Sequence, residues 1–323
     1  MIISQIIRKY ATITNMKSKA KEILKDGAVG AGIGCAVIVP GISGGTIALI
    51  TGAFKKIVSA VDKLFSKLFW KNFAILIPFG IGAILAIAAL YFPITLAFEH
   101  CLLAIVCLFA GFMIGSVPSV TDKVKDKKAS TRELVLGICG FIIVVLFGVL
   151  SLLFNLNTTV EQTFINNSWY LYPILLAVGI ISSTGLIVPG FSGSMLLMVV
   201  GFYDKILNLV KQISLQPGLA ILRLLTFAVG VALGFVLFSK LMKKLFEKYP
   251  RETNFVVLGF LIGSIIAIFV NSQMFSYFGY YDGANQLNVL DYILAPIFAL
   301  CGLAGSIAIY FYVKKHPEVN ENA

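Results

Sequence analysis

Residues 37–57 read VIVPGISGGTIALITGAFKKI, and residues 186–206 read LIVPGFSGSMLLMVVGFYDKI. Both stretches place Pro-Gly and small hydroxyl residues inside an apolar run, where a membrane helix would otherwise continue. Short apolar pieces joined by such a break are typical of re-entrant hairpins or discontinuous helices, which line the substrate sites of many transporters. The two copies therefore predict two broken helices inside a membrane.

The rest of the chain repeats at almost the same spacing as the two motifs. FGIGAIL begins at Phe79 and FAVGVAL begins 148 residues later, at Phe227. GFMIGS begins at Gly111 and GFLIGS begins at Gly259, again 148 residues later. A fixed offset between several anchors in one order is typical of an internal duplication. Two glutamates share this register: Glu99 and Glu247.

The composition indicates a protein that crosses a membrane several times. Hydrophobic residues make up 59% of the chain and charged residues only 13%, with a mean hydropathy of +0.94. Soluble domains are about half apolar and a quarter charged. A crossing helix needs about 20 apolar residues. The long apolar segments that we expect to cross are 72–98, 101–120, 133–154, 219–241, 254–270 and 289–313.

The distribution of basic residues predicts the orientation of the two halves. If each broken stretch enters and leaves on one side, each half crosses three times and the halves are oppositely oriented. This arrangement puts 23 of the 26 lysines and arginines on one side, as expected for cytoplasmic loops. Full crossings by the broken stretches would scatter them over both sides. The sequence thus predicts an all-α polytopic membrane protein with inverted-topology repeats, each a re-entrant helical hairpin plus three transmembrane helices, and both termini in the cytoplasm.

The N-terminal segment is expected to lie on the membrane surface. Ile3, Ile7, Tyr10 and Ile13 recur at helical spacing among lysines, a pattern typical of a helix on an anionic bilayer. Loop and surface charges of this kind account for the net charge of +11 without nucleic acid. The predicted parts are a basic amphipathic interfacial helix over 1–26, a first membrane repeat over 27–155, a second, inverted repeat over 156–316 and a cytoplasmic tail over 317–323.

The two motifs form the candidate substrate site. A helix that restarts after a break turns free N–H groups and its positive dipole end toward the break, which suits an anion. Inverted repeats would bring both tips together near the membrane midplane. The alternative is that Gly and Ser only allow close helix packing. The candidate binding residues are Pro40, Gly41, Ser43, Gly44, Gly45, Thr46, Pro189, Gly190, Ser192, Gly193 and Ser194.

Four ionisable residues outside the motifs are further candidates. Glu99 and His100 end one predicted crossing and form a candidate pair for proton coupling; the alternative is that both simply face solvent. Glu247 lies among lysines, so charge pairing in a loop is its alternative role. Arg223 is the only arginine expected on the outer side. It either attracts phosphate head groups or anchors a helix end.

The motifs also carry a resemblance to a known family. VPGISGGTIALITG and VPGFSGSMLLMVVG, each followed by a glutamate and then by GFMIGS or GFLIGS, are similar to DUF368, a bacterial membrane family long labelled only as a domain of unknown function. Its members are described as polyprenyl-phosphate transporters that return undecaprenyl phosphate to the cytoplasmic leaflet for cell-envelope synthesis. The resemblance implies a lipid-phosphate substrate held at the two tips, a role for the paired glutamates, and a place in the bacterial cytoplasmic membrane. The basic residues beside the two hairpins differ: Lys55 and Lys56 in the first, Asp204 and Lys205 in the second.

Two other functions are weighed against transport of a lipid phosphate. An integral-membrane lipid pyrophosphate phosphatase would need a cationic clamp and an activated nucleophile. Neither tip contains Arg, Lys, His or Asp, and the only histidines are His100 and His316. An inorganic anion channel or exchanger could use the same site. We expect a protein that is not an enzyme, needs no cofactor or metal, and has protons or another ion as candidate coupling partners. No segment argues for a homo-oligomer.

Overall fold

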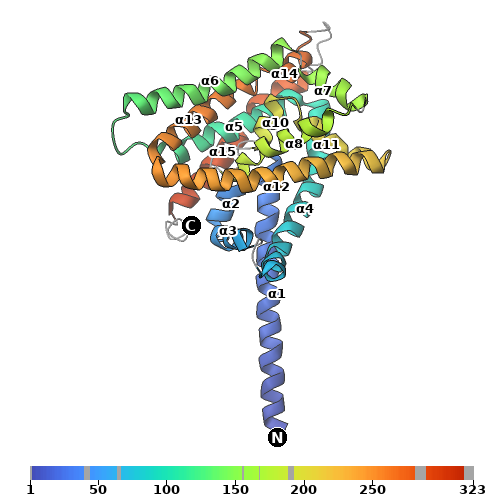
Figure 1. Cartoon of the computed structure of the whole chain (residues 1–323), viewed down its shortest axis with the longest axis vertical. Helices are drawn as coiled ribbons and strands as arrows, with labels where there is room; N and C mark the ends of the chain where they lie inside the picture. Colours follow the sequence, from blue (N-terminus) through green and yellow to red (C-terminus); the bar gives the residue numbers. More distant parts are fainter. Residues whose placement is uncertain are drawn as a thin grey trace.

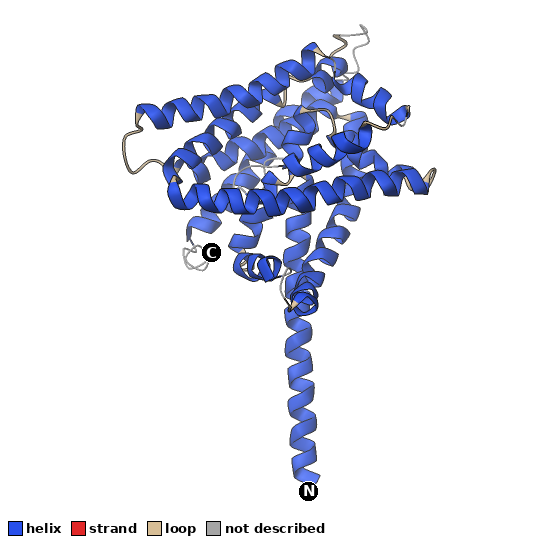
Figure 2. Ribbon diagram, viewed as in Figure 1, coloured by secondary structure: helices blue, strands red, loops and turns tan. Residues whose placement is uncertain are grey.

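The structure, a computed structural model, describes residues 2–39, 44–63, 67–154, 156–166, 168–187, 193–280 and 289–315. Across these ranges every regular element is a helix, and no strand occurs (Figure 2). The protein is therefore all-α, as the sequence predicts.

Each half of the chain contributes a similar series of helices. The first half contains α1 (Ile2–Ile38), α2 (Gly44–Ile50), α3 (Phe54–Asp62), α4 (Phe69–His100), α5 (Leu102–Thr121) and α6 (Thr131–Leu153). The second half contains α7 (Leu156–Ile165), α8 (Leu171–Ser182), α9 (Thr184–Ile187), α10 (Gly193–Val199), α11 (Tyr203–Gln212), α12 (Pro217–Lys248), α13 (Pro250–Ala267), α14 (Ser272–Tyr277) and α15 (Val289–Lys315).

Six helical segments of the described chain are long and apolar enough to cross a membrane. They are Phe69–His100, Leu102–Thr121, Thr131–Leu153, Pro217–Lys248, Pro250–Tyr277 and Val289–Lys315. All six coincide with the apolar segments expected to cross. The prediction of a polytopic membrane protein is thus confirmed at the level of helix length and composition.

The helices recur at the spacing of the sequence repeat. Helices α4 and α12 are both 32 residues long and start 148 residues apart. Helices α5 and α13 also start 148 residues apart, and α2 and α10 start 149 residues apart. The third long helix is α6 in the first half and α15 in the second half. The opposite orientation of the halves and the re-entrant path of the motifs stay predictions.

The long helices pack in two different ways. Within each half, the first long helix packs along the segment before the motif, so α4 pairs with α1 and α12 pairs with α8. The second and third long helices pair across the halves, so α5 lies along α15 and α13 lies along α6 (Figure 1). The two halves are consequently interlocked, because each supplies a helix to the other.

Glycines allow the cross-half pairs to approach closely. A side-chain carbon added at Gly111 of α5 would lie 2.2 Å from the carbonyl oxygen of Ala299 in α15. One added at Gly259 of α13 would lie 1.9 Å from the carbonyl oxygen of Gly137 in α6. Small residues at such crossings let helix backbones touch in membranes. The repeated GFMIGS and GFLIGS strings therefore mark matching helix contacts.

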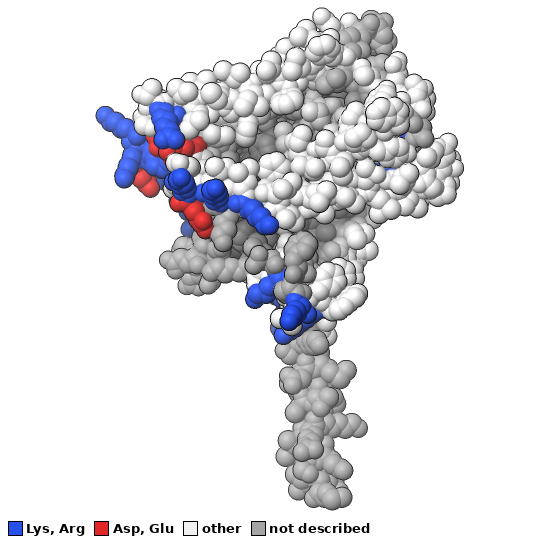
Figure 3. Space-filling view, viewed as in Figure 1, with Lys and Arg blue, Asp and Glu red and all other residues white. Residues whose placement is uncertain are grey.

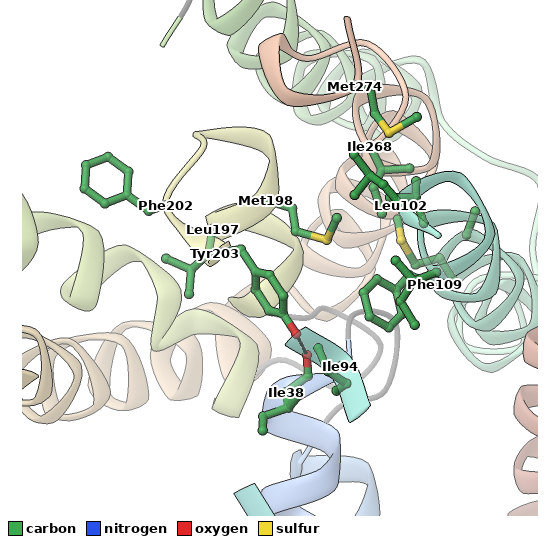
Figure 4. Close-up of a cluster of buried hydrophobic side chains, with 14 of the residues drawn as sticks. Ile38, Ile94, Leu102, Phe109, Leu197, Met198, Phe202, Tyr203, Ile268 and Met274 are labelled. Atoms are coloured by element: carbon green, nitrogen blue, oxygen red, sulfur yellow. Dashed lines mark hydrogen bonds between the residues drawn. The ribbon is translucent and has the colours of Figure 1, made fainter. Parts of the chain in front are cut away.

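The main hydrophobic core lies where the two halves meet. It gathers buried side chains from α1, α4, α5, α7, α8, α10, α11, α12, α13 and α14. Figure 4 shows Ile38, Phe109, Met198 and Tyr203 from four of these helices, with Ile268 directly after α13. The helices that flank both Pro-Gly motifs thus contribute to one shared core.

Helix α1 differs in extent from the predicted N-terminal part. It runs without a break from Ile2 to Ile38, so no helix end marks the boundary expected at residue 26. Its N-terminal half projects away from the helical body (Figure 1). The prediction that this segment lies on a membrane surface is untested.

Candidate functional site

The centres of the two Pro-Gly motifs lie outside the described residues. This applies to Pro40, Gly41 and Ser43 in the first motif and to Pro189, Gly190 and Ser192 in the second, as well as to the side chain of Thr46. Their role as binding residues stays a prediction. The structure does describe the helices that enter and leave each motif, and these frame the candidate site.

A helix ends before each motif and a new helix begins directly after it. Helix α1 ends at Ile38 and α2 begins at Gly44, while α9 ends at Ile187 and α10 begins at Gly193. Gly44, Gly45, Gly193 and Ser194 are all buried. A side-chain carbon added at Gly193 would lie 1.9 Å from the carbonyl oxygen of Ser182, so only glycine fits there.

The helices flanking the two motifs touch each other. The Tyr203 hydroxyl, at the start of α11, donates a hydrogen bond of 2.7 Å to the carbonyl oxygen of Ile38, in the last turn of α1 (Figure 4). The Tyr203 ring also packs against Phe98 and Phe109, with centroid distances of 5.3 and 6.4 Å. Helix α2 lies against α9, and α1 lies against α10. The fold therefore brings the helices that flank the two motifs together in the protein interior.

A lysine follows each motif at an equivalent position. Lys56 in α3 and Lys205 in α11 lie 149 residues apart. The Lys56 ammonium contacts Glu22 and Asp26 at 2.7 and 2.6 Å. The Lys205 ammonium contacts Asp204 at 2.8 Å and Glu161 at 3.4 Å. The residues that follow the two motifs differ in sequence, but one cation in each half is held by two carboxylates.

The four other candidate residues lie at helix ends or in packing contacts. Arg223 is only 4% exposed and donates from Nη2 to the carbonyl oxygen of Phe164 at 2.7 Å, with its guanidinium 5.3 Å from the Phe164 ring centroid. These contacts tie α12 to α7, as expected of a helix anchor. Glu99 and His100 are exposed at the end of α4, and Lys211 lies 3.9 Å from the Glu99 carboxylate. Glu247 is exposed near the end of α12.

Sequence reasoning did not find an apolar groove between α6, α12 and α13. The groove has a volume of about 470 Å³, and its mouth is the hollow between α6 and α12 (Figure 3). Arg132, Tyr249 and Glu252 line its outer end, and Ile181, Thr184 and Leu196 line its inner end, beside the second motif. We call it the α6–α12 groove. These helices are apolar on most sides, so no periodicity in the sequence points to one face.

Charged side chains gather at one edge of the molecule. In the view of Figure 3, lysines, arginines and carboxylates lie around the ends of α6, α12 and α13 and near the start of α4, while the remaining described surface is mostly uncharged. The outer end of the α6–α12 groove belongs to this charged edge. Within the described ranges, no three His, Cys, Asp or Glu side chains are grouped so that they could hold a metal ion.

Six long apolar helices, with the helices that flank both motifs in contact, define a multi-pass α-helical membrane protein built from two similar halves. Comparison with known sequences then gives the family. The chain belongs to the undecaprenyl phosphate translocase-like family, whose model matches residues 33–284.

Two curated relatives agree with this family. A polyprenyl-phosphate transporter of Staphylococcus aureus is 30% identical over 244 residues, covering 74% of this chain and 84% of the relative. A polyprenyl-phosphate transporter of Vibrio cholerae is 27% identical over 329 residues, covering 94% of this chain and all of the relative. No solved structure matches this chain significantly.

Proposed function

We propose that this protein moves polyprenyl phosphate across the bacterial cytoplasmic membrane, returning undecaprenyl phosphate to the cytoplasmic leaflet. The names of the family and of both relatives support this substrate. The observation that carries the mechanism is the hydrogen bond between Tyr203 and Ile38, because it joins the helices flanking the two motifs. Contact between these helices supports one shared phosphate site at the two tips.

The phosphate is held mainly by backbone N–H groups and hydroxyls at the tips. Helices α2 and α10 are only seven residues long, so their dipoles add less than those of full helices. Free N–H groups at the start of each helix and the hydroxyls of Ser43 and Ser192 supply the donors. The lipid tail stays in the bilayer while the head group crosses between the halves.

Inverted repeats give this site alternating access from the two sides of the membrane. Matching helix spacing and the exchange of α6 and α15 between the halves support this arrangement. Cysteines introduced at Thr159 and Gly283, in a background lacking the five native cysteines, should react with an impermeant thiol reagent outside the cell. A cysteine at Lys127 should react only after the membrane is opened. Labelling of position 127 in intact cells contradicts the inverted arrangement and the cytoplasmic termini.

Substitution of the two serines tests the phosphate site. Ser43→Ala and Ser192→Ala should each weaken binding of a polyprenyl monophosphate about tenfold to a hundredfold, since a hydroxyl donor to a charged acceptor is worth about 1.5–3 kcal/mol. Ser43→Asp should bind more weakly than Ser43→Ala, because its carboxylate repels the phosphate. Neutral polyprenol is the control ligand. If Ser43→Asp binds the phosphate as well as the parent does, the site is elsewhere.

Reconstituted vesicles test the function itself. We expect movement of polyprenyl phosphate between leaflets without release of phosphate. Release of phosphate from a lipid pyrophosphate would identify a phosphatase instead, and flux of an inorganic anion without lipid movement would identify a channel or exchanger. A pH gradient across the vesicles tests coupling to protons, for which Glu99 and His100 are the candidate residues. Transport by Glu99→Gln that still responds to the gradient excludes Glu99.

A further inference from the structure

The α6–α12 groove joins a polar outer end to the second Pro-Gly motif. Arg132, at the start of α6, lies at the outer end together with Tyr249 and Glu252. Thr184 of α9 and Leu196 of α10, the helices on either side of the motif, lie at the inner end. The walls between the two ends are apolar. The groove therefore has the amphipathic form of a lipid with a charged head.

The guanidinium of Arg132 is available to a new partner. Its side chain is 68% exposed, and its Nη1 atom lies 3.8 Å from the Glu252 carboxylate. Its guanidinium carbon lies 5.6 Å from the Tyr249 ring centroid. An exposed and long ion pair of this kind contributes little to stability. Arginine binds phosphate oxygens through two parallel N–H donors, so a phosphate can replace the carboxylate.

We propose that the α6–α12 groove is a docking site for polyprenyl phosphate in the leaflet on the charged side of the protein. The phosphate binds Arg132 at the outer end, and the first isoprenyl units lie between α6 and α12 with the chain directed toward Thr184. This inference rests on the proposed function, and it adds a second position for the lipid besides the tips. In this proposal the lipid enters or leaves the protein through the α6–α12 groove, in the leaflet on the charged side.

Size and charge favour this occupant. The volume of about 470 Å³ falls within the range of about 300–1,000 Å³ for ligand pockets, which admits a few isoprenyl units while the rest of the chain stays in the bilayer. A phosphate monoester carries about 1.5 to 2 negative charges near pH 7, whereas the phosphodiester of a phospholipid carries one. The arginine at the outer end therefore favours the monoester. The inner end places the chain beside the hairpin that the lipid must pass.

Filling the groove tests the chain position. Leu241 and Leu237 lie one turn apart on α12 and are 47% and 59% exposed, but only Leu241 is among the residues that line the groove. Leu241→Trp should weaken binding of a polyprenyl monophosphate at least tenfold in nanodiscs of a neutral phospholipid. Leu237→Trp should bind like the parent. Phe147→Trp, on the opposite wall and 50% exposed, provides a second filled groove in case one variant folds poorly.

Replacing the arginine tests the head-group position. Arg132→Gln should weaken binding at least tenfold, whereas Lys128→Gln, exposed in the loop before α6 and outside the groove, should leave it near the parent value. If Arg132→Gln and both filled grooves bind like the parent while Ser43→Asp does not, the docking site is wrong and the proposed function stands. If the parent protein binds no polyprenyl phosphate, both proposals fail. Equal competition by phosphatidylglycerol makes the groove a general lipid site and overturns the inference.

Discussion

The two cross-half helix pairs, α6 with α13 and α15 with α5, are joined by different chemistry at equivalent places. The third residue of α6 is Glu133, and the third residue of α15 is Asp291. Glu133 accepts a hydrogen bond of 2.8 Å from Nε of Arg251 in the first turn of α13. Asp291 instead accepts the backbone N–H groups of Leu103 and Ala104 in the first turn of α5, at 3.2 and 2.8 Å.

The difference follows the distribution of basic residues. The Glu133 junction lies at the charged edge in Figure 3, where Arg251 is its partner. The segment between residues 271 and 288 contains no lysine or arginine. At the other junction the N–H groups at the positive end of α5 and the Tyr277 hydroxyl donate hydrogen bonds to the acid instead. Each half thus supplies an acid at the same place in its third helix, and the acid's partner depends on whether a basic residue lies nearby.

The largest expected effect comes from replacing the glycine at which the two helices of each cross-half pair touch. In Gly111→Val and Gly259→Val the added Cβ would lie 2.2 and 1.9 Å from a facing carbonyl oxygen if the backbone did not move. Both distances are well inside van der Waals contact. Because helix backbones cannot yield cheaply, we expect both variants to lose most folded protein, as measured by fluorescence-detected gel filtration. Gly80→Val in α4, where an added carbon meets open space, is the control and should accumulate normally. Normal yield of either junction variant contradicts the close crossing.

The second prediction separates the junctions. Asp291→Ala leaves two backbone donors and the Tyr277 hydroxyl without this acceptor in a site where Asp291 is 0% exposed. Each buried donor left unsatisfied costs about 1–3 kcal/mol, so we expect a large fall in the melting temperature in detergent. Asp291→Asn retains one acceptor oxygen, so its melting temperature should lie between those of the parent and of Asp291→Ala. A melting temperature unchanged in Asp291→Ala would show that water replaces the acid at this junction.

The long helices and the repeated motifs could be predicted from the sequence, but the contacts that join the two halves could not. Apolar length and Pro-Gly are local features, so the six long helices and the repeated motifs follow from them directly. The exchange of α6 and α15 depends on contacts between residues far apart in the chain, such as Gly111 and Ala299, which no local pattern encodes. The same holds for Tyr203 with Ile38 and for the α6–α12 groove. Arg223 was left between two roles because a sequence does not give burial.

The unbroken path of α1 has a related physical reason. A change from basic to apolar composition near residue 26 suggested a boundary, but neither Asp26 nor Gly27 ends a helix when the following residues pack well. A side-chain carbon added at Gly82 of α4 would lie 1.9 Å from the carbonyl oxygen of Gly27. This close packing against α4 holds the backbone of α1 helical across the change in composition.

The third prediction concerns salt and charge at the α6–α13 junction. Glu133→Gln should lower the melting temperature less than Asp291→Ala does, because Arg251 can turn to solvent and its side chain is 26% exposed. The difference between Glu133→Gln and the parent should shrink slightly at high ionic strength, since Arg251 is partly exposed, and partly buried pairs are screened only weakly. The deficit of Asp291→Ala should not shrink. A deficit that behaves alike in both variants removes the distinction between the two junctions.

The smallest effect is expected at the far end of the α5–α15 pair. Asp122, just after α5, accepts a hydrogen bond of 2.6 Å from Tyr310 in α15. This bond, with one from Lys125, lowers the pKa of Asp122 to about 2. A depressed carboxyl pKa stabilises the fold above the ordinary pKa of 3.8 and is lost as the pH falls toward 2. Asp122→Asn should therefore melt slightly below the parent at pH 7, and the gap should close between about pH 4 and pH 2. A gap that persists at pH 2 assigns the effect to packing.

The exchange of helices between the halves also sets the order of events during synthesis. Helix α5 ends at Thr121, but its partner α15 begins only at Val289, 168 residues later. At about 5–20 residues per second, the ribosome needs on the order of ten to thirty seconds to supply that partner. During this interval α5, with eleven positions that are buried in the finished protein, has α4 beside it but lacks its main partner α15. The protein can therefore complete its fold only after α15 has been synthesised. Until then the first half is incompletely packed, and we expect it to depend on chaperones or to be degraded.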